Sequence, residues 1–160
     1  MRKVVSNTTP ILSLLKIGKL DLLQKLYGKI KIPNAVFREI EAGKDRDYYT
    51  DITKLSWIEI IPIQSNSARL YLFDLDDGEA ETIILAQEQA ADVVIIDDKL
   101  GRRYAAQINI PITGTIGILL KAKERGLITA VTPLLYELRN KSSWINDSLL
   151  TKAISLAGEL

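Results

Sequence analysis

The segment from Val93 to Asp98 places the strongest constraint on what this chain can fold into. Four apolar, β-branched residues, Val93 to Ile96, are followed at once by Asp97 and Asp98. A short run of this kind predicts a strand that is buried on both faces, as in a parallel sheet, and ligands bind at the carboxyl ends of such strands. Because adjacent carboxylates repel each other, we expect a cation, a metal ion, a raised pKa or open solvent to offset them.

Segments typical of strands and of helices alternate along the rest of the chain. Further strands are predicted at residues 2–6, 29–32, 57–63 and 110–112, and helices at residues 10–17, 20–27, 33–42, 79–90, 99–108, 116–125, 133–139 and 146–156. The polar stretch 44–56 predicts a helix and a surface loop. The alternation predicts a parallel sheet that is covered by helices on both faces.

Individual residues sharpen some of these boundaries. Thr9 is predicted to cap the first helix, with Pro10 as its first helical residue. Pro62 cannot donate a ladder hydrogen bond, so the strand at 57–63 is expected at an edge of the sheet or near its own end.

The absence of histidine and cysteine limits the possible chemistry. None of the 160 residues is His or Cys, which excludes Ser-His-Asp and Cys-His catalysis, disulfides and thiolate metal sites. Zinc, copper and non-haem iron are disfavoured, because their sites depend on imidazole or thiolate. Any metal must be held by oxygen, which points to Mg²⁺ or Mn²⁺.

Charge and hydropathy indicate a soluble protein. The net charge is +1, so a nucleic-acid site would need a local basic patch. The amino terminus is too short and too soon polar for a signal peptide, and no apolar run reaches the ~18 residues of a membrane helix. We therefore expect a cytoplasmic protein with no membrane partner.

Polar and acidic residues follow successive predicted strands. Asn7 follows the first strand, Asp97 and Asp98 follow the Val93 strand, and Thr113 and Thr115 follow the last strand. Glu39 lies on the helix after the second strand, and Glu79 and Glu81 lie in the first turn of the helix that leads to the Val93 strand. Distant segments are thus expected to bring three or four acids together, and such a cluster of oxygen ligands can hold one or two Mg²⁺ ions.

Each of these residues also has a simpler interpretation. Glu79 can complete a capping box with Asp76, one of the two aspartates can cap the helix that begins at Lys99, and Glu39 can be a solvated helix acid. Glu79 and Glu81 are two positions apart, so at most one is expected to point inward. Arg102 and Arg103 fit a solvated face, and Thr113 to Thr115 fit a turn.

Several segments, in order, resemble a PIN domain. They are Val4-Val5-Ser6-Asn7-Thr8-Thr9-Pro10-Ile11, Ile32-Pro33-Asn34-Ala35-Val36-Phe37-Arg38-Glu39-Ile40, Asp77-Gly78-Glu79-Ala80-Glu81-Thr82-Ile83-Ile84-Leu85-Ala86, Val94-Ile95-Ile96-Asp97-Asp98-Lys99, and Thr113-Gly114-Thr115-Ile116-Gly117 with Gly126-Leu127-Ile128. The resemblance implies a three-layer α/β/α sandwich with a central parallel sheet. It implies one PIN-like domain over residues 1–160, with C-terminal helices from about residue 132.

The resemblance also implies an activity and its residues. It implies a Mg²⁺- or Mn²⁺-dependent ribonuclease, a toxin-like component of a VapBC-type system that is inhibited by a small antitoxin and forms a homodimer. Carried over by position, the metal ligands are Glu39, Glu79 and Asp98, with Glu81 and Asp97 as alternatives. Candidate contacts to the RNA substrate are Lys99, Arg102, Arg103 and Thr115.

Asn7 departs from the family's pattern. Members of the family usually have aspartate at this position, and asparagine offers a neutral oxygen without charge or basicity. Fewer anions should weaken the binding of a divalent metal. Two hypotheses follow: a working ribonuclease with Asn7 as a neutral ligand or water-orienting group, or a catalytically weak RNA- or protein-binding module on the same fold.

Overall fold

A five-stranded parallel sheet organises the molecule. The computed structural model describes residues 2–142 and 144–160, and within them β1 (Val4–Ser6), β2 (Ile30–Ile32), β3 (Ile58–Ile60), β4 (Val93–Ile95) and β5 (Ile112–Thr113) form one sheet in the order β3-β2-β1-β4-β5. Every pair of neighbouring strands is parallel. The predicted parallel sheet is confirmed.

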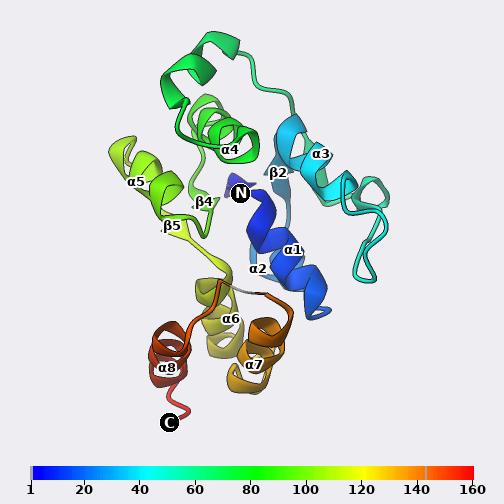
Figure 1. The fold of residues 1–160 in the computed structure, drawn as a ribbon, viewed down its shortest axis with the longest axis vertical. Coiled ribbons are helices and arrows are strands. Elements are labelled where there is room, and N and C mark those ends of the chain that lie inside the picture. The colour runs from blue at the N-terminus through cyan, green and yellow to red at the C-terminus, as the bar shows by residue number, and fades with distance from the viewer. Residues whose placement is uncertain (1, 143) are drawn as a thin grey trace.

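Helices connect the strands in the predicted alternation (Figure 1). They are α1 (Thr8–Lys16), α2 (Asp21–Tyr27), α3 (Asn34–Glu41), α4 (Asp77–Glu88), α5 (Lys99–Gln107), α6 (Thr115–Glu124), α7 (Thr132–Lys141) and α8 (Asp147–Leu156), with short 3-10 helices η1 (Ile52–Lys54) and η2 (Asn66–Leu72). None of the helices in the described part of the chain has the length and apolar character needed to span a membrane.

Two apolar cores lie on opposite faces of the sheet. Consecutive strand residues point to opposite faces, so Val4 packs in the core with α1, α2, α6, α7 and α8, while Val5 packs in the core with α4 and α5. Figure 1 shows α6, α7 and α8 gathered at the end of the molecule that carries the C-terminus, with α4 toward the other end. This is the predicted three-layer α/β/α sandwich.

The strand order creates a switch point beside β1. The chain moves outward from β1 to β2 and β3, then returns to place β4 on the other side of β1. Connections leave β1 and β4 in opposite directions, which opens a crevice at their carboxyl ends. The register pairs Ser6 with Ile95, so Asn7 and the two aspartates after β4 emerge at this same point.

Two local predictions are wrong. Helix α1 begins at Thr8, with Asn7 rather than Thr9 in the N-cap position, because the Asn7 N–H still pairs with the Ile95 carbonyl at 2.9 Å. Pro10 is tolerated at the third helical position, since the first N–H groups of a helix have no intrahelical partner.

The predicted edge position of the third strand is confirmed, because β3 is the last strand on its side of the sheet.

The second wrong prediction concerns residues 44–56. The expected helix is replaced by turns and the short 3-10 helix η1. The Asp51 carboxylate accepts hydrogen bonds from the Thr53 N–H at 3.1 Å and the Thr53 hydroxyl at 2.6 Å. Such local side-chain bonds compete with helical hydrogen bonding and favour a turn.

Candidate active site

Asn7 contributes a buried amide at the switch point. Its side chain is 3% exposed, and its Oδ1 has no hydrogen-bond partner among the described residues. The side chain also makes no capping bond to α1. Leaving a buried polar atom unpaired costs roughly 1–3 kcal/mol, so such an atom requires an explanation.

Glu79 and Asp98 form a pair of interacting carboxyls across α4 and α5. Burial and hydrogen bonds to Asp76 and Asp98 raise the pKa of Glu79 to about 9. The same interaction with Glu79 lowers the pKa of Asp98. Glu79 therefore keeps its proton beside the Asp76 and Asp98 carboxylates, which would otherwise repel it.

The same acids also serve the helix ends that hold them. The Asp76 carboxylate accepts a hydrogen bond from the Glu79 N–H at 2.8 Å, at the start of α4. Asp98 is the N-cap of α5 and accepts from the Gly101 N–H at 2.9 Å. The interpretation of Asp98 as a helix cap is thus correct, and capping leaves its second oxygen available.

Glu39 is held by Thr8 and by close packing against Gly78. The Thr8 hydroxyl donates to Glu39 Oε1 at 2.6 Å, which joins α3 to the first residue of α1. A Cβ added to Gly78 would lie 2.6 Å from the same oxygen, so a larger residue there would displace the Glu39 carboxylate. Burial raises the pKa of Glu39, partly offset by the bond from Thr8.

Asp97 points away from this pair and binds Thr115. The Thr115 N–H and hydroxyl both donate to the Asp97 carboxylate, at 2.8 and 2.7 Å. Burial raises the pKa of Asp97, while these bonds and the charge of Arg102 oppose the rise. Thr115 is fully buried, so its hydroxyl is committed to Asp97.

Glu81 points to the opposite side of α4 from Glu79. Its Oε1 accepts from the Ala35 N–H at 3.1 Å, and its Oε2 lies 3.8 Å from Arg38 Nη2. Glu81 therefore caps the start of α3, and the structure does not bring it into the Glu79–Asp98 pair. The expectation that only one of Glu79 and Glu81 points toward the cluster is confirmed.

The predicted basic residues are exposed on α5. Lys99, Arg102 and Arg103 all lie at the surface, and the first two line a cleft beside Asp97 and Asp98. Arg103 is not part of that lining.

Two positioning residues were not predicted from the sequence. Thr8 orients Glu39, and Gly78 leaves space for its carboxylate. Both lie in the segments that resemble a PIN domain, next to Asn7 and Glu79. Their position next to Asn7 and Glu79 was the only sign of a role at the site. It was not specific, because threonine and glycine also occur at ordinary helix starts.

The donor set suits a hard divalent cation that keeps much of its water. In residues 2–142 and 144–160 there is no group of three or more acidic side chains placed to hold a metal together. Mg²⁺ commonly uses only one or two carboxylates and retains several waters. The Glu79–Asp98 pair and the unpaired, buried Asn7 Oδ1 fit that requirement.

Comparison with known proteins identifies the family. A family model described as a PIN domain matches residues 3–159. The chain therefore belongs to the PIN domain family, which is nuclease-like. No curated protein matches the chain significantly.

Proposed function

We propose that this protein is a Mg²⁺- or Mn²⁺-dependent ribonuclease of the PIN type. The observation that carries the proposal is the unpaired Asn7 Oδ1, buried at the switch point where Asp98 also emerges. A buried acceptor with no protein donor suits a cation or its water. Membership of a nuclease-like family supports the same reaction class.

Asn7, Glu79 and Asp98 would hold the cation, and Glu39 would contribute from α3 through water. The cation would supply positive charge to a phosphoryl group and make water more acidic. Glu79 gives up its proton when the pair becomes a ligand. Thr8 and Gly78 keep Glu39 in place, so its carboxylate needs little reorganisation. A water would attack the phosphorus in line and lose a proton to solvent, while the P–O bond to a ribose oxygen breaks and that oxygen takes up a proton from solvent.

We propose further partners on the strength of the family. RNA is the substrate, a small antitoxin is the inhibitor of a toxin-like VapBC-type component, and the protein forms a homodimer. The 3-10 helix η2 and the residue after it supply three large apolar side chains that suit a protein partner. Leu70, Tyr71 and Phe73 are 75%, 81% and 84% exposed. Three large exposed apolar side chains this close in sequence are a candidate interaction surface.

Asn7 favours a second candidate, a weakly catalytic RNA- or protein-binding module on the same fold. An amide in place of a carboxylate removes one charge from the proposed site. With fewer anions, affinity for a divalent cation falls. Replacing Asn7 with aspartate therefore separates the two candidates.

The test compares wild type, Asp98→Asn and Asn7→Asp in a single-stranded RNA cleavage assay with Mn²⁺. Because the cation contributes several kcal/mol of transition-state stabilisation, we expect Asp98→Asn to lower the rate by about 10²-fold or more. Asp47→Asn, an exposed acid in the turn after α3, is the matched control and should be unchanged. A small effect of Asn7→Asp supports a working asparagine site.

Two results argue against the ribonuclease. If wild type does not cleave RNA and Asp98→Asn behaves identically, the proposal is wrong. If only Asn7→Asp cleaves RNA, and only Asn7→Asp gains thermal stability on addition of Mn²⁺, then the natural chain is the binding module. The stability measurement reports metal binding independently of turnover.

A further inference from the structure

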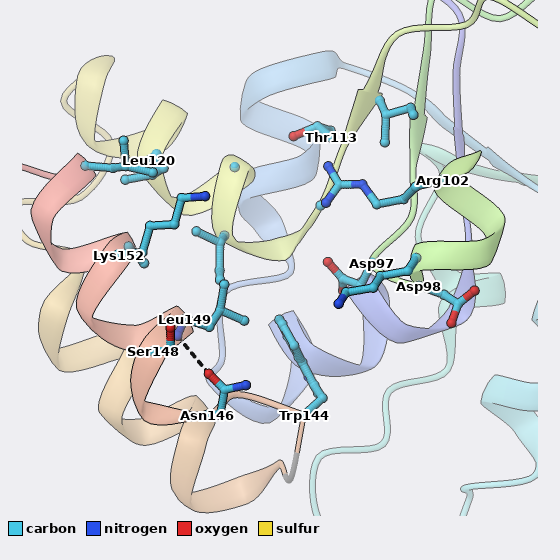
Figure 2. Close-up of a pocket in the computed structure, with 17 residues that line it drawn as sticks. Asp97, Asp98, Arg102, Thr113, Leu120, Trp144, Asn146, Ser148, Leu149 and Lys152 are labelled. Atoms are coloured by element: carbon cyan, nitrogen blue, oxygen red, sulfur yellow. Dashed lines mark hydrogen bonds between the residues drawn. The ribbon is translucent and has the colours of Figure 1, made fainter. Parts of the chain in front are cut away.

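A cleft of about 770 Å³ begins at Asp97 and Asp98. One wall comes from α5, β5 and α6, and the other comes from α8 and the residues before it (Figure 2). Its floor is apolar and includes Ile116, Leu120 and Leu149. The cleft has the size of a small-molecule site and joins segments distant in sequence.

Three cations line this cleft without a partner. They are Lys99 and Arg102 on α5 and Lys152 on α8. In the described part of the chain, none of the three forms an ion pair or a side-chain hydrogen bond. Figure 2 shows Arg102 and Lys152 pointing into the cleft from opposite walls.

The two acids in the cleft, Asp97 and Asp98, offset only part of this positive charge. Asp97 directs its carboxylate to Thr115, and Asp98 caps α5. The net charge of the whole chain is only +1, so this is a local concentration of positive charge. Three cations against two acids, each with a hydrogen bond elsewhere, leave the cleft an excess of positive charge, which attracts anionic ligands.

We propose that the α5–α8 cleft, defined by Lys99, Arg102 and Lys152 over the apolar floor, binds one nucleotide of the RNA strand next to the proposed cleavage site. The phosphate lies between Arg102 and Lys152, and the base packs on the apolar floor. This inference rests on the proposed function, because it assigns a subsite to that substrate. The cleft begins at Asp97 and Asp98, so a strand that leaves the acid pair reaches it within a short distance.

An acidic peptide is the competing occupant. It would meet the same cations but would have no flat base for the apolar floor. A nucleotide has a phosphate for the cations and a base for the apolar floor. The observations therefore favour RNA, and a peptide is an outcome of the test.

The experiment measures binding without turnover. Fluorescein-labelled 2′-O-methyl A4 and U4 oligonucleotides, which resist cleavage, are titrated with full-length protein in EDTA and followed by anisotropy. Ser148→Glu places an anion in the cleft, whereas Ser155→Glu places one elsewhere on the exposed surface of α8. We expect Ser148→Glu to weaken binding at least tenfold and Ser155→Glu to change it less than twofold.

Lys152→Ala tests the phosphate contact. The expected loss is about tenfold, and the slope of log K against log salt should fall by about 0.7, the value for one contact to a single strand. Lys54→Ala removes an exposed charge on η1 and is the control. Circular dichroism of each variant checks that the fold is kept.

The outcomes separate this inference from the proposed function. Equal effects of Ser148→Glu and Ser155→Glu, or an unchanged salt slope in Lys152→Ala, overturn the inference even if the protein cleaves RNA. Displacement of the oligonucleotide by an equimolar hexaglutamate peptide overturns it in favour of a peptide ligand. If no metal supports cleavage but Ser148→Glu still weakens binding at least tenfold, the cleft binds RNA, and the ribonuclease proposal fails together with the placement of the cleft next to a cleavage site.

Discussion

At the scale of single residues, surroundings decide what each acid does. Asp97 and Asp98 are neighbours in sequence, yet one bonds to Thr115 and the other interacts with Glu79. Glu79 and Glu81 are separated in the same way by the turn of α4. Four chemically similar carboxyl groups therefore occupy three different environments, and among the four only Glu79 and Asp98 interact with each other.

The Glu79–Asp98 pair makes the free energy of unfolding depend on pH. Glu79 has a folded-state pKa of about 9, above its ordinary value, so between roughly pH 5 and pH 9 the folded protein binds a proton that the unfolded chain has lost. The contribution of Glu79 to the free energy of unfolding therefore decreases as pH rises through this range. We expect Glu79→Gln, measured by urea denaturation in EDTA, to flatten this fall.

Asp98→Asn should act differently in the same experiment. Its pKa is lowered, so its charged form stabilises the fold above its ordinary pKa and that contribution is lost toward acid pH. For the Glu79 prediction, the contradicting result is a free energy of unfolding of Glu79→Gln that falls from pH 6 to pH 8.5 as much as that of wild type. Glu79 would then not keep its proton in the folded state.

At the scale of secondary-structure elements, side chains from elsewhere complete the helix ends. Asp76, Asp98 and Asn146 are N-cap residues of their own helices, α4, α5 and α8. Helix α3 follows Pro33, whose side chain has no acceptor, and Glu81 of α4 supplies the missing acceptor to Ala35. The bond ties together α3 and α4, which carry the carboxyl groups of Glu39 and Glu79.

Glu81→Ala should destabilise the protein without removing the proposed metal site. Loss of a capping acceptor costs about 1 kcal/mol, and the nearby Arg38 charge is exposed and adds little. We expect a lower midpoint in urea denaturation and an unchanged thermal shift with Mn²⁺. A loss of the Mn²⁺ shift as large as that of Glu79→Ala would place Glu81 in the site instead.

At the scale of the whole molecule, hydrogen bonds to the C-terminal segment hold α6, α7 and α8 together. The Glu159 carboxylate accepts from the Val131 N–H, the Thr132 N–H and Lys123 Nζ, each at 2.8 Å. It thereby joins the tail after α8 to the start of α7 and the end of α6. Helices α6 and α8 line opposite walls of the α5–α8 cleft, and all three helices form part of the larger core.

Glu159→Ala should loosen this end of the molecule. The bond from Lys123 is the largest of the effects that lower the pKa of Glu159 to about 2, so its charged form stabilises the fold above its ordinary pKa. That stabilisation is lost as pH falls from roughly 4.5 to 2. We expect wild type to be more stable than the variant at pH 7 by urea denaturation, with the difference shrinking toward pH 2. A difference that persists unchanged at pH 2 would mean that packing, and not charge, is responsible.

The sequence predicted elements better than their ends. Strand cores such as Val93–Ile95 were found because β-branched runs have few alternatives. The helix expected between 44 and 56 was wrong because Asp51 bonds locally to Thr53. Such a bond competes with helical hydrogen bonds, and hydrophobic spacing does not reveal that competition. The start of α1 was misplaced because a sheet contact from Asn7 to Ile95 extends the strand ladder past Ser6.

The sequence by itself determined the parallel sheet, the oxygen-only chemistry and the set of acids at strand ends, because hydrophobic period and residue type are local properties. Only the tertiary structure decided which acids meet. The strand register placed Asn7 beside the end of β4, and the turn of α4 separated Glu79 from Glu81. The hydrogen bond from Thr115 directs Asp97 away from the Glu79–Asp98 pair. Contacts between residues tens of positions apart depend on packing, which spacing along one chain does not encode.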